Sequence, residues 1–432
     1  MPASDRARGA LYGLAIGDAL GMPAQMLSRQ QITARWGSLL TGFEPAPPGH
    51  PIAAGLPPGA VTDDTEQAVL LARMLIKGHG TLDPEEWAAA LIGWERDMAE
   101  RGSLDLLGPS TKRALAAVLA GTPPEEAGQH GDTNGAAMRI PPVGIAFAAT
   151  APSASNAPAP DENRPDAHDT DGPPPTADHA VQASGVTHDT ADRPVLVGGA
   201  VEAAGDAGET VGLSVLVDRV AGTSGVTHDT ADRLPLAGWV AGTSRVAHNA
   251  EGLLALVDRV VEASLVTHNT SVALAGAAAV AAAVSAGVGG ANVGTAIDAG
   301  ITAARLAARR GHWVAGADVA ARIRWATGLV SDAGPDHPAE LICTLVGTSL
   351  ATQESVPAAF AVLSVVPDDP WRACLLAASL GGDTDTIAAM AGAIAGACHG
   401  QSAFPPHAIA TIDAHGFALP ALADSLLALR SQ

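Results

Sequence analysis

Two short acidic segments of the sequence carry side chains that could bind metal ions. The first is Val61-Thr-Asp-Asp-Thr-Glu66, and the second is Gly381-Gly-Asp-Thr-Asp-Thr386. Each crowds carboxylates and hydroxyls into the junction between a loop and an apolar segment. Adjacent carboxylates repel one another unless a positive charge lies between them. Because hard divalent cations such as Mg²⁺ prefer oxygen ligands, two such loops facing each other could hold two ions that orient a substrate and activate water.

Helix capping is the alternative interpretation of both segments. Asp and Thr are favoured N-cap residues, and carboxylates in a first turn interact well with the helix dipole. For either segment alone, capping is the simpler explanation. The presence of two near-matching segments, one of them with a double glycine, favours a metal site.

Three further motifs contain residues suited to binding or structure. Asp18 lies between Gly17 and Gly21, with Gln25 seven residues beyond it. The alternative to a binding role for this motif is a glycine turn at the end of a helix. The segment Gly131-Asp-Thr-Asn-Gly-Ala-Ala-Met-Arg139 is a glycine-rich loop that opens a helix, so its N–H groups suit a phosphate or a ribose hydroxyl. The last motif is Thr267-His268, although a lone histidine is more often structural.

The segments that must position these motifs are predicted to be helical. Asp83 is a candidate cap for a helix that opens at Pro84, and residues 42–59 read as a Pro/Gly-rich loop. Alternating patterns typical of strands are scarce. The predicted helices are Ala10–Leu20, Glu66–Ile76, Pro84–Trp94, Ser271–Ala286, Val293–Arg310, Ala315–Val330, Pro338–Ala351, Pro357–Val365, Trp371–Ser379, Asp385–Cys398 and Pro420–Arg430.

The middle of the chain differs from both flanks. Residues 151–175 are rich in proline and poor in apolar residues, which is typical of disorder. His188, His228, His248 and His268 then fall on a 20-residue lattice, with Gly208 in the remaining slot, within partly repeated sequence. A solenoid is one interpretation of a fixed period, but the uneven apolar positions favour a repeat inserted into a loop. We therefore predict one catalytic domain, formed by residues 1–150 and 251–432, with residues 151–250 as a partly disordered insertion.

Composition excludes several classes of protein. The chain of 432 residues has 24 basic and 45 acidic residues, a net charge of −21, so a nucleic-acid backbone is not an expected partner. We expect no membrane span, because the most apolar segment, Val272–Val288, reads as a close-packed buried helix. Three cysteines without CxxC spacing and an N-terminus without a secretion signal predict a reduced, cytoplasmic protein.

Taken together and in this order, the five motifs resemble those of the ADP-ribosylglycohydrolase family. This family includes the hydrolases that remove ADP-ribose from dinitrogenase reductase and the ADP-ribosyl-acceptor hydrolases. The resemblance covers about residues 6–150 and 251–400. It implies an all-α orthogonal helical bundle around a cleft with two Mg²⁺ ions, or Mn²⁺ in some members. It also implies metal-assisted hydrolysis of the glycosidic bond between ADP-ribose and an acceptor, either an ADP-ribosylated protein or a small ADP-riboside.

The resemblance assigns roles to individual residues. The implied catalytic carboxylates are Asp63, Asp64 and Asp385. The implied metal ligands are Thr62, Asp63, Asp64, Asp383, Asp385 and Thr386. The implied substrate-binding residues are Asp18, Asn134, Gly135, Ala136, Met138, His268 and Gly382.

Gln25 departs from the family pattern, in which many active members carry Glu at this position. Glutamine cannot act as a general base, so Asp63, Asp64 or Asp385 would transfer the proton, or the substrate differs. A hydrolase of a small, nucleoside-like riboside and a non-catalytic family member therefore remain alternatives to hydrolysis of ADP-ribosyl conjugates.

Overall fold

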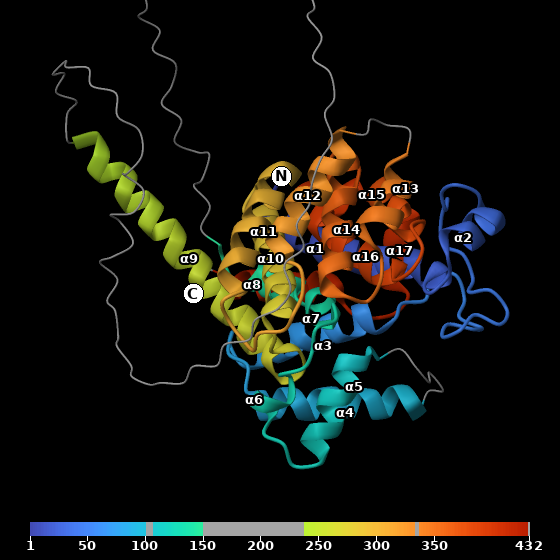
Figure 1. Ribbon diagram of the computed structural model, residues 1–432, viewed down its shortest axis with the longest axis horizontal. Helices are drawn as coiled ribbons and strands as arrows, with labels where there is room; N and C mark the ends of the chain where they lie inside the picture. The colour runs from blue at the N-terminus through green and yellow to red at the C-terminus, as the bar shows by residue number, and fades with distance from the viewer. Residues whose placement is uncertain (101–106, 150–236, 333–336, 431–432) are drawn as a thin grey trace, which may run out of the picture. The chain divides into compact units, whose positions relative to one another are not determined.

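The computed structural model describes residues 1–100, 107–149, 237–332 and 337–430. Within these ranges, residues 237–250 are described by their backbone alone. None of these residues forms a strand; isolated bridges join Thr133 to Ala351 and Thr270 to His312. The described residues from both sides of the gap at 150–236 belong to one unit of packed helices (Figure 1). The predicted all-α class is confirmed, whereas the prolines and repeats of residues 151–236 lie outside the described residues.

The helices before the gap are α1 (Ala3–Gly21), α2 (Arg29–Trp36), α3 (Asp63–Lys77), α4 (Pro84–Glu100), α5 (Pro109–Leu119), α6 (Pro124–Ala127), α7 (Gly135–Arg139) and α8 (Pro141–Ala146), with a 3₁₀ turn at Met22–Ala24. Those after it are α9 (Ala237–His268), α10 (Ser271–Val288), α11 (Val293–Ala307), α12 (Val319–Asp332), α13 (Pro338–Leu341), α14 (Thr352–Val365), α15 (Pro370–Ala378), α16 (Thr384–His399), α17 (Pro406–Asp413) and α18 (Leu419–Leu429). A π-helical turn covers Ile342–Val346, and a 3₁₀ turn covers Gln401–Ala403.

Helix α9 begins at Ala237, inside the segment predicted to be an insertion, and continues to His268. Its backbone joins the last repeat to the second half of the unit without a break. The predicted cap of α4 is present, because the N–H of Glu86 donates to the Asp83 carboxylate at 2.9 Å.

Most predicted helices differ from the observed ones at one or both ends, and for two of them the structure gives the physical reason. The expected helix Pro338–Ala351 stops at Val346, since Gly347 adopts a φ of 90°. The expected helix start at Pro357 is wrong, because α14 begins at Thr352 and carries Pro357 inside it. Proline removes one helical hydrogen bond, and Arg322 of α12 instead donates its Nε–H to the freed carbonyl of Gln353 at 3.1 Å.

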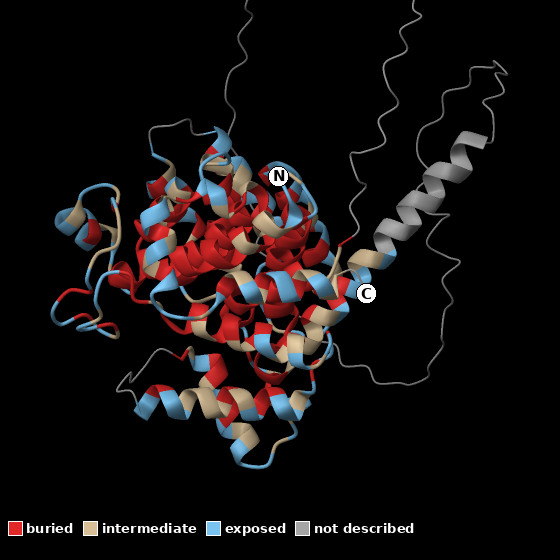
Figure 2. Ribbon diagram, turned by 180° about the vertical axis from the view of Figure 1, so that it is seen from behind, coloured by how far each residue is buried: buried red, intermediate tan, exposed pale blue. Residues whose placement is uncertain are grey.

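Among the described helices, α1 and α16 pack most extensively against each other, and most residues of both belong to the buried class that Figure 2 shows in red. Glycines recur every fourth residue on α1 and face the backbone of α16. A Cβ atom on Gly13 would lie 2.0 Å from the carbonyl oxygen of Gly392, and one on Gly17 would lie 2.0 Å from that of Ala388. Only glycine fits such an approach, so this pairing fixes where the first and last thirds of the chain meet.

Helix α10 is the apolar segment singled out in the sequence. It is long and apolar enough to cross a membrane by length and composition, with a mean hydropathy of 1.9. All of its residues are buried among the other helices, which is the position of a core helix.

Candidate active site

The first acidic segment begins α3, with Thr62 as its N-cap residue. Behind it lies the fully buried carboxylate of Asp18 on α1. This carboxylate accepts hydrogen bonds from the backbone N–H of Thr62 at 2.9 Å, the backbone N–H of Thr65 at 3.1 Å and the hydroxyl of Thr65 at 2.5 Å. Asp18 therefore satisfies N–H groups at the start of α3 and fixes that end of the helix against α1.

The second acidic segment begins α16 after two glycines with positive φ. Gly381 has a φ of 91° and Gly382 a φ of 76°. A Cβ atom on Gly382 would lie 2.2 Å from the carbonyl oxygen of Thr348. The Gly382 peptide pairs with the chain after α1, since its N–H donates to Leu27 O at 2.9 Å and its carbonyl accepts from Met26 N at 2.6 Å.

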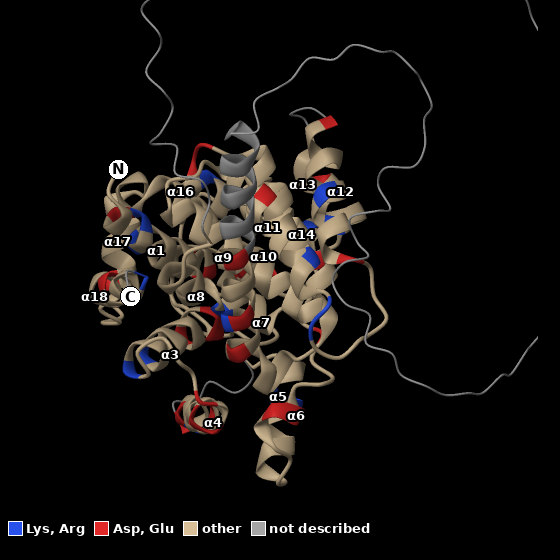
Figure 3. Cartoon of the chain, turned by 90° about the vertical axis from the view of Figure 1, so that its left-hand side faces the viewer, with Lys and Arg blue, Asp and Glu red and all other residues tan. Residues whose placement is uncertain are grey.

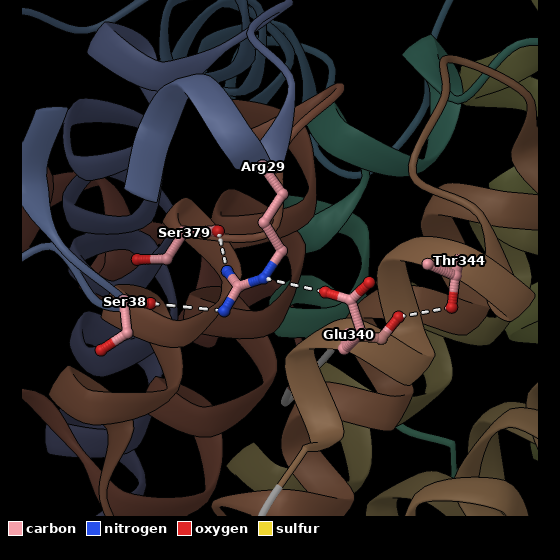
Figure 4. A network of polar contacts seen from close by, with 5 residues as sticks. All are labelled: Arg29, Ser38, Glu340, Thr344 and Ser379. Atoms are coloured by element: carbon pink, nitrogen blue, oxygen red, sulfur yellow. Dashed lines mark hydrogen bonds and ion pairs between the residues drawn. The ribbon is translucent and has the colours of Figure 1, made fainter. Parts of the chain in front are cut away.

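Arg29 contacts Ser379, at the end of α15 and just before the two glycines (Figure 4). Its Nη1 donates to the backbone carbonyl of Ser379 at 2.5 Å, and its Nε lies 3.7 Å from Glu340. Its Nη2 donates to the carbonyl of Ser38 at 3.5 Å. The loop that carries the second acidic segment is thus tied to the start of α2.

Helices α1, α3 and α16 bring the two acidic segments together. Carboxylate oxygens of Asp18, Asp64 and Asp385 all lie within 4.8 Å of one another. The hydroxyl of Thr386 donates to Asp64 Oδ2 at 3.3 Å, which links the segments directly. Other acidic residues lie on exposed turns of helices such as α4 and α6 (Figure 3), so this buried cluster is not part of a general acidic surface.

Burial makes the charged forms of these carboxylates costly. Burial and then repulsion from neighbouring aspartates raise the pKa of Asp63, Asp64 and Asp385 well above its usual range. Burial also raises the pKa of Asp18 and of Asp383 to about 6, and hydrogen bonds to each carboxylate limit the rise. Protons or a bound cation must offset the charge of this cluster.

A cavity of about 300 Å³ opens onto the acidic cluster. Three buried polar atoms of its lining residues have no hydrogen-bond partner among the described residues: Asp64 Oδ1, Asp385 Oδ1 and Gln25 Nε2. The lining residues are Gln25, Met26, Ile52, Asp63, Asp64, Leu107, Gly108, Pro109, Lys112, Thr133, Asn134, Gly135, Met138, Leu350, Asp383, Asp385 and Thr386.

These residues fit a hard divalent cation. The donors are oxygen atoms only, and two of the carboxylate oxygens are buried without a partner. Capping accounts for Thr62, whose hydroxyl accepts from Asp64 N at 3.4 Å, but Asp383 at the start of α16 makes no side-chain cap bond. The capping alternative therefore leaves most of the carboxylates unexplained.

The glycine-rich loop before α7 forms another wall of the cavity. Asn134 donates its amide hydrogens to Asp383 Oδ2 and to Ser355 Oγ, the latter at 3.0 Å. Gly135 lies against the imidazole of His268, where a Cβ atom would be 2.8 Å from Cε1. His268 is fully buried at the end of α9, and its Nε2 lies 3.1 Å from the Thr133 hydroxyl.

The structure brings most of the predicted site residues to one cavity. Asp63, Asp64, Asn134, Gly135, Met138, Asp383, Asp385 and Thr386 line it. The remaining predicted residues lie behind its walls: Asp18 and Thr62 at the start of α3, Ala136 within α7, His268 behind Gly135, and Gly382 in the loop before α16. Asp18 and Gly382 hold the backbone there, and the substrate contacts expected of them stay a prediction.

Sequence reasoning missed several residues that hold the site in place. Gln67 donates its amide hydrogen to Asp63 Oδ2 at 3.1 Å and accepts a hydrogen bond from Arg139 Nη1 at 2.8 Å. The spacing of Gln67 from Asp63, one helical turn, is a signal that could have found it. Arg139 ends the glycine-rich motif, but nothing local indicates that its guanidinium is buried.

Comparison with known proteins finds several whose sequences are similar to this chain. The uncharacterized protein YegU of Escherichia coli (strain K12) is 29% identical over 412 residues, 95% of this chain and 92% of its own. The ADP-ribosyl-[dinitrogen reductase] glycohydrolase of Rhodospirillum rubrum is 33% identical over 147 residues, 33% of this chain and 45% of its own. Human ADP-ribosylhydrolase ARH3 is 42% identical over 76 residues, 15% of this chain and 21% of its own.

The whole chain also matches a family and a fold. A solved structure described as "ADP-ribosylglycohydrolase-related protein complex" covers 99% of both chains with a TM-score of 0.55 at 20% identity, which shows a shared fold. The family model described as ADP-ribosylglycohydrolase matches residues 1–241 and 240–432. Because this match spans both halves of the chain, the protein belongs to the ADP-ribosylglycohydrolase family of glycosyl hydrolases.

Proposed function

We propose that this protein is a magnesium-dependent hydrolase that cleaves the glycosidic bond between ADP-ribose and an acceptor. The observation that carries the proposal is the pair of buried, unpartnered oxygens, Asp64 Oδ1 and Asp385 Oδ1, beside a cavity of about 300 Å³. The names of the R. rubrum and human relatives support the same type of bond. An ADP-ribosylated protein or a small ADP-riboside is the proposed substrate.

The cations would be held by Asp63, Asp64, Asp383, Asp385 and Thr386, which line the cavity. When bound, Mg²⁺ or Mn²⁺ supplies a Lewis acid and lowers the pKa of a coordinated water. Thr62 lies one step behind, with its hydroxyl oxygen 2.8 Å from Asp18 Oδ1 and 3.1 Å from Asp64 Oδ2, so it also orients these carboxylates.

Proton transfer falls to the aspartates, because the neutral Gln25 amide donates hydrogen bonds from Nε2 and accepts them at Oε1 but cannot take up a proton. Asp63 Oδ2 already accepts from Gln67. Among the described residues, the Oδ1 atoms of Asp64 and Asp385 make no hydrogen bond, and whichever of the two does not ligate a cation can accept a proton from water. Gln25 Nε2, which also has no partner, can donate to an oxygen of the bound substrate.

The test is release of ADP-ribose from conjugates with defined linkages, with Mg²⁺ and with a chelator. We expect release that requires the cation and is lost in Asp383→Asn. The exposed Asp368, changed to Asn, is the matched control and should keep full activity. The proposal would be contradicted if the protein released ADP-ribose from none of these linkages.

Gln25 favours a second candidate, hydrolysis of a small riboside that needs no charged group at this position. Activity on nucleoside-like ribosides without activity on ADP-ribosyl conjugates would identify it. A non-catalytic role is the third candidate. Turnover by the wild type that Asp383→Asn abolishes would exclude that role.

A further inference from the structure

A buried chain of hydrogen bonds joins the acidic cluster to the opposite end of the glycine-rich loop. Its centre is Arg139, which is 1% exposed at the end of α7 and lies over the ring of Trp87, 5.6 Å from the centroid. Its guanidinium donates from Nη1 to Gln67 Oε1 at 2.8 Å and from Nη2 to Thr267 Oγ1. The metal-site mechanism above makes no use of this cation.

Arginine only donates hydrogen bonds, so it fixes the direction of every bond that follows. Toward the acidic cluster, the carbonyl oxygen of Gln67 must face Arg139. The amide nitrogen of Gln67 is then free to donate to Asp63 Oδ2, at 3.1 Å. This arm orients Asp63 in the cavity wall.

Toward the loop, Arg139 donates to the oxygen of Thr267, so the hydroxyl hydrogen of Thr267 needs an acceptor elsewhere. Thr267 is fully buried, and among the described residues its other hydrogen-bond contact is His268 Nδ1 at 2.8 Å. Buried hydroxyl hydrogens are paired in folded proteins. His268 Nδ1 is therefore the acceptor, and the ring hydrogen lies on Nε2.

The imidazole stays neutral in this position. Burial, and then the positive charges of Arg139 and Arg113, hold the pKa of His268 well below its usual range. A neutral ring with its hydrogen on Nε2 donates to Thr133 Oγ1, at 3.1 Å. Thr133 lines the cavity, and its own hydroxyl hydrogen is left for a group inside it.

We propose that Arg139 is a positioning residue that fixes the Nε2–H tautomer of His268 and thereby makes Thr133 a hydrogen-bond donor to the ligand. The bond dipoles from the Arg139 guanidinium through Thr267 and His268 to Thr133 all point the same way. Their positive end faces the cavity, which favours an anionic oxygen such as a phosphate oxygen. The choice of ADP-ribose as the probe ligand rests on the proposed function, whereas the inference about the His268 tautomer does not.

The tautomer is tested directly by ¹⁵N NMR of histidine-labelled protein, with the His268 signals identified by their loss in His268→Asn. We expect a protonated Nε2 and an unprotonated Nδ1 from pH 6 to 8, and a measurable Nδ1–H fraction in Arg139→Met. Arg430→Met is the matched control. That partly buried arginine donates to the backbone carbonyls of Gly144 and Ser285, so its loss should leave the His268 signals unchanged.

The donor role is tested by calorimetry with ADP-ribose. Thr133→Val removes the hydroxyl and should weaken binding roughly tenfold to a hundredfold, the range for a hydrogen bond to a charged group. Thr133→Ser keeps the hydroxyl and should bind within about threefold of the wild type.

Two results would overturn the inference: an Nδ1–H tautomer in the wild type, or equal affinities of Thr133→Val and Thr133→Ser. If the wild type did not bind ADP-ribose, the proposed function would fail. The His268 spectrum would still decide the inference.

Discussion

Replacing Asp385 by Asn should stabilise the cation-free protein while it removes the response to Mg²⁺. The carboxylate of Asp385 lies in a cluster with those of Asp18 and Asp64, all within 4.8 Å. Two full charges at that distance repel by about 3 kcal/mol at an effective dielectric constant of about 20. Burial and neighbouring aspartates raise the pKa of Asp385, so uptake of protons relieves part of this repulsion, and we expect a net gain of about 2 kcal/mol.

The gain can be expressed as a melting temperature. An unfolding entropy of about 2.1 cal/mol/K per residue means that about 1 kcal/mol moves the Tm of a domain of this size by roughly 1–2 °C. In chelator, Asp385→Asn should then melt about 3 °C above the wild type. With Mg²⁺ at about 100 times its Kd, the wild type should gain about 2.7 kcal/mol and the variant almost nothing, so the order of stability reverses.

Differential scanning fluorimetry in chelator and over a Mg²⁺ titration measures both effects. Asp368→Asn is the control for a change of one charge on an exposed residue. A variant that melts below the wild type in chelator, or that keeps the full Mg²⁺ shift, would refute the argument from repulsion.

Three further predictions follow from the same structure. Without divalent cations, the free energy of unfolding should rise as the pH falls from 7 to 4, because burial raises the pKa of Asp18 from 3.8 to about 6. The cost of keeping this buried carboxylate ionised is about 3 kcal/mol; it is complete above pH 6 and absent below pH 3.8. Denaturant titrations across this range measure it, and a fall in stability would be the wrong sign. Gly382→Ala should destabilise the protein by more than about 2 kcal/mol, because the φ of Gly382 is 76° and an added Cβ would lie 2.2 Å from Thr348 O. Gly290→Ala is the control, since φ is also positive there but no atom lies within 4 Å of the added Cβ. Equal Tm values of the two variants would contradict the steric reason. A chain in which a short Gly/Ser linker replaces residues 156–236 should keep its helical circular dichroism and its Mg²⁺ response, since the residues on both sides form one unit, and loss of either would show that the segment is needed.

The sequence is informative about the helices because alanine-rich segments leave few alternatives to close-packed helices. Its local rules fail where a distant residue changes the outcome. Pro357 reads as a helix start, yet Arg322 of α12 satisfies the carbonyl that this proline leaves free inside α14. No local pattern indicates that an arginine from another helix will be there.

The same distinction holds for the site. The acidic segments at residues 61–66 and 381–386 are visible because their crowded carboxylates are unusual, and the structure places both at one cavity. The positions of Asp18 and Gly382 behind the cavity wall depend on which helix packs against which. The hydrogen-bond chain through Arg139 depends on the same packing, because its members come from α3, α7, α9 and the loop before α7.

The glycine contacts between α1 and α16 have a consequence for synthesis of the protein. Asp18 and Asp64 are both made early in synthesis, whereas Asp385 follows Asp18 by more than 360 residues. Asp385 joins the other two carboxylates only when α16 packs on α1. Because a ribosome makes the chain from its N-terminus, α1 must wait for nearly the whole polypeptide before it finds its partner. Until then its row of glycines has no surface to pack against. A truncated or nascent chain that ends before residue 385 therefore lacks one carboxylate of the proposed cation site, and cation binding would report completion of the fold.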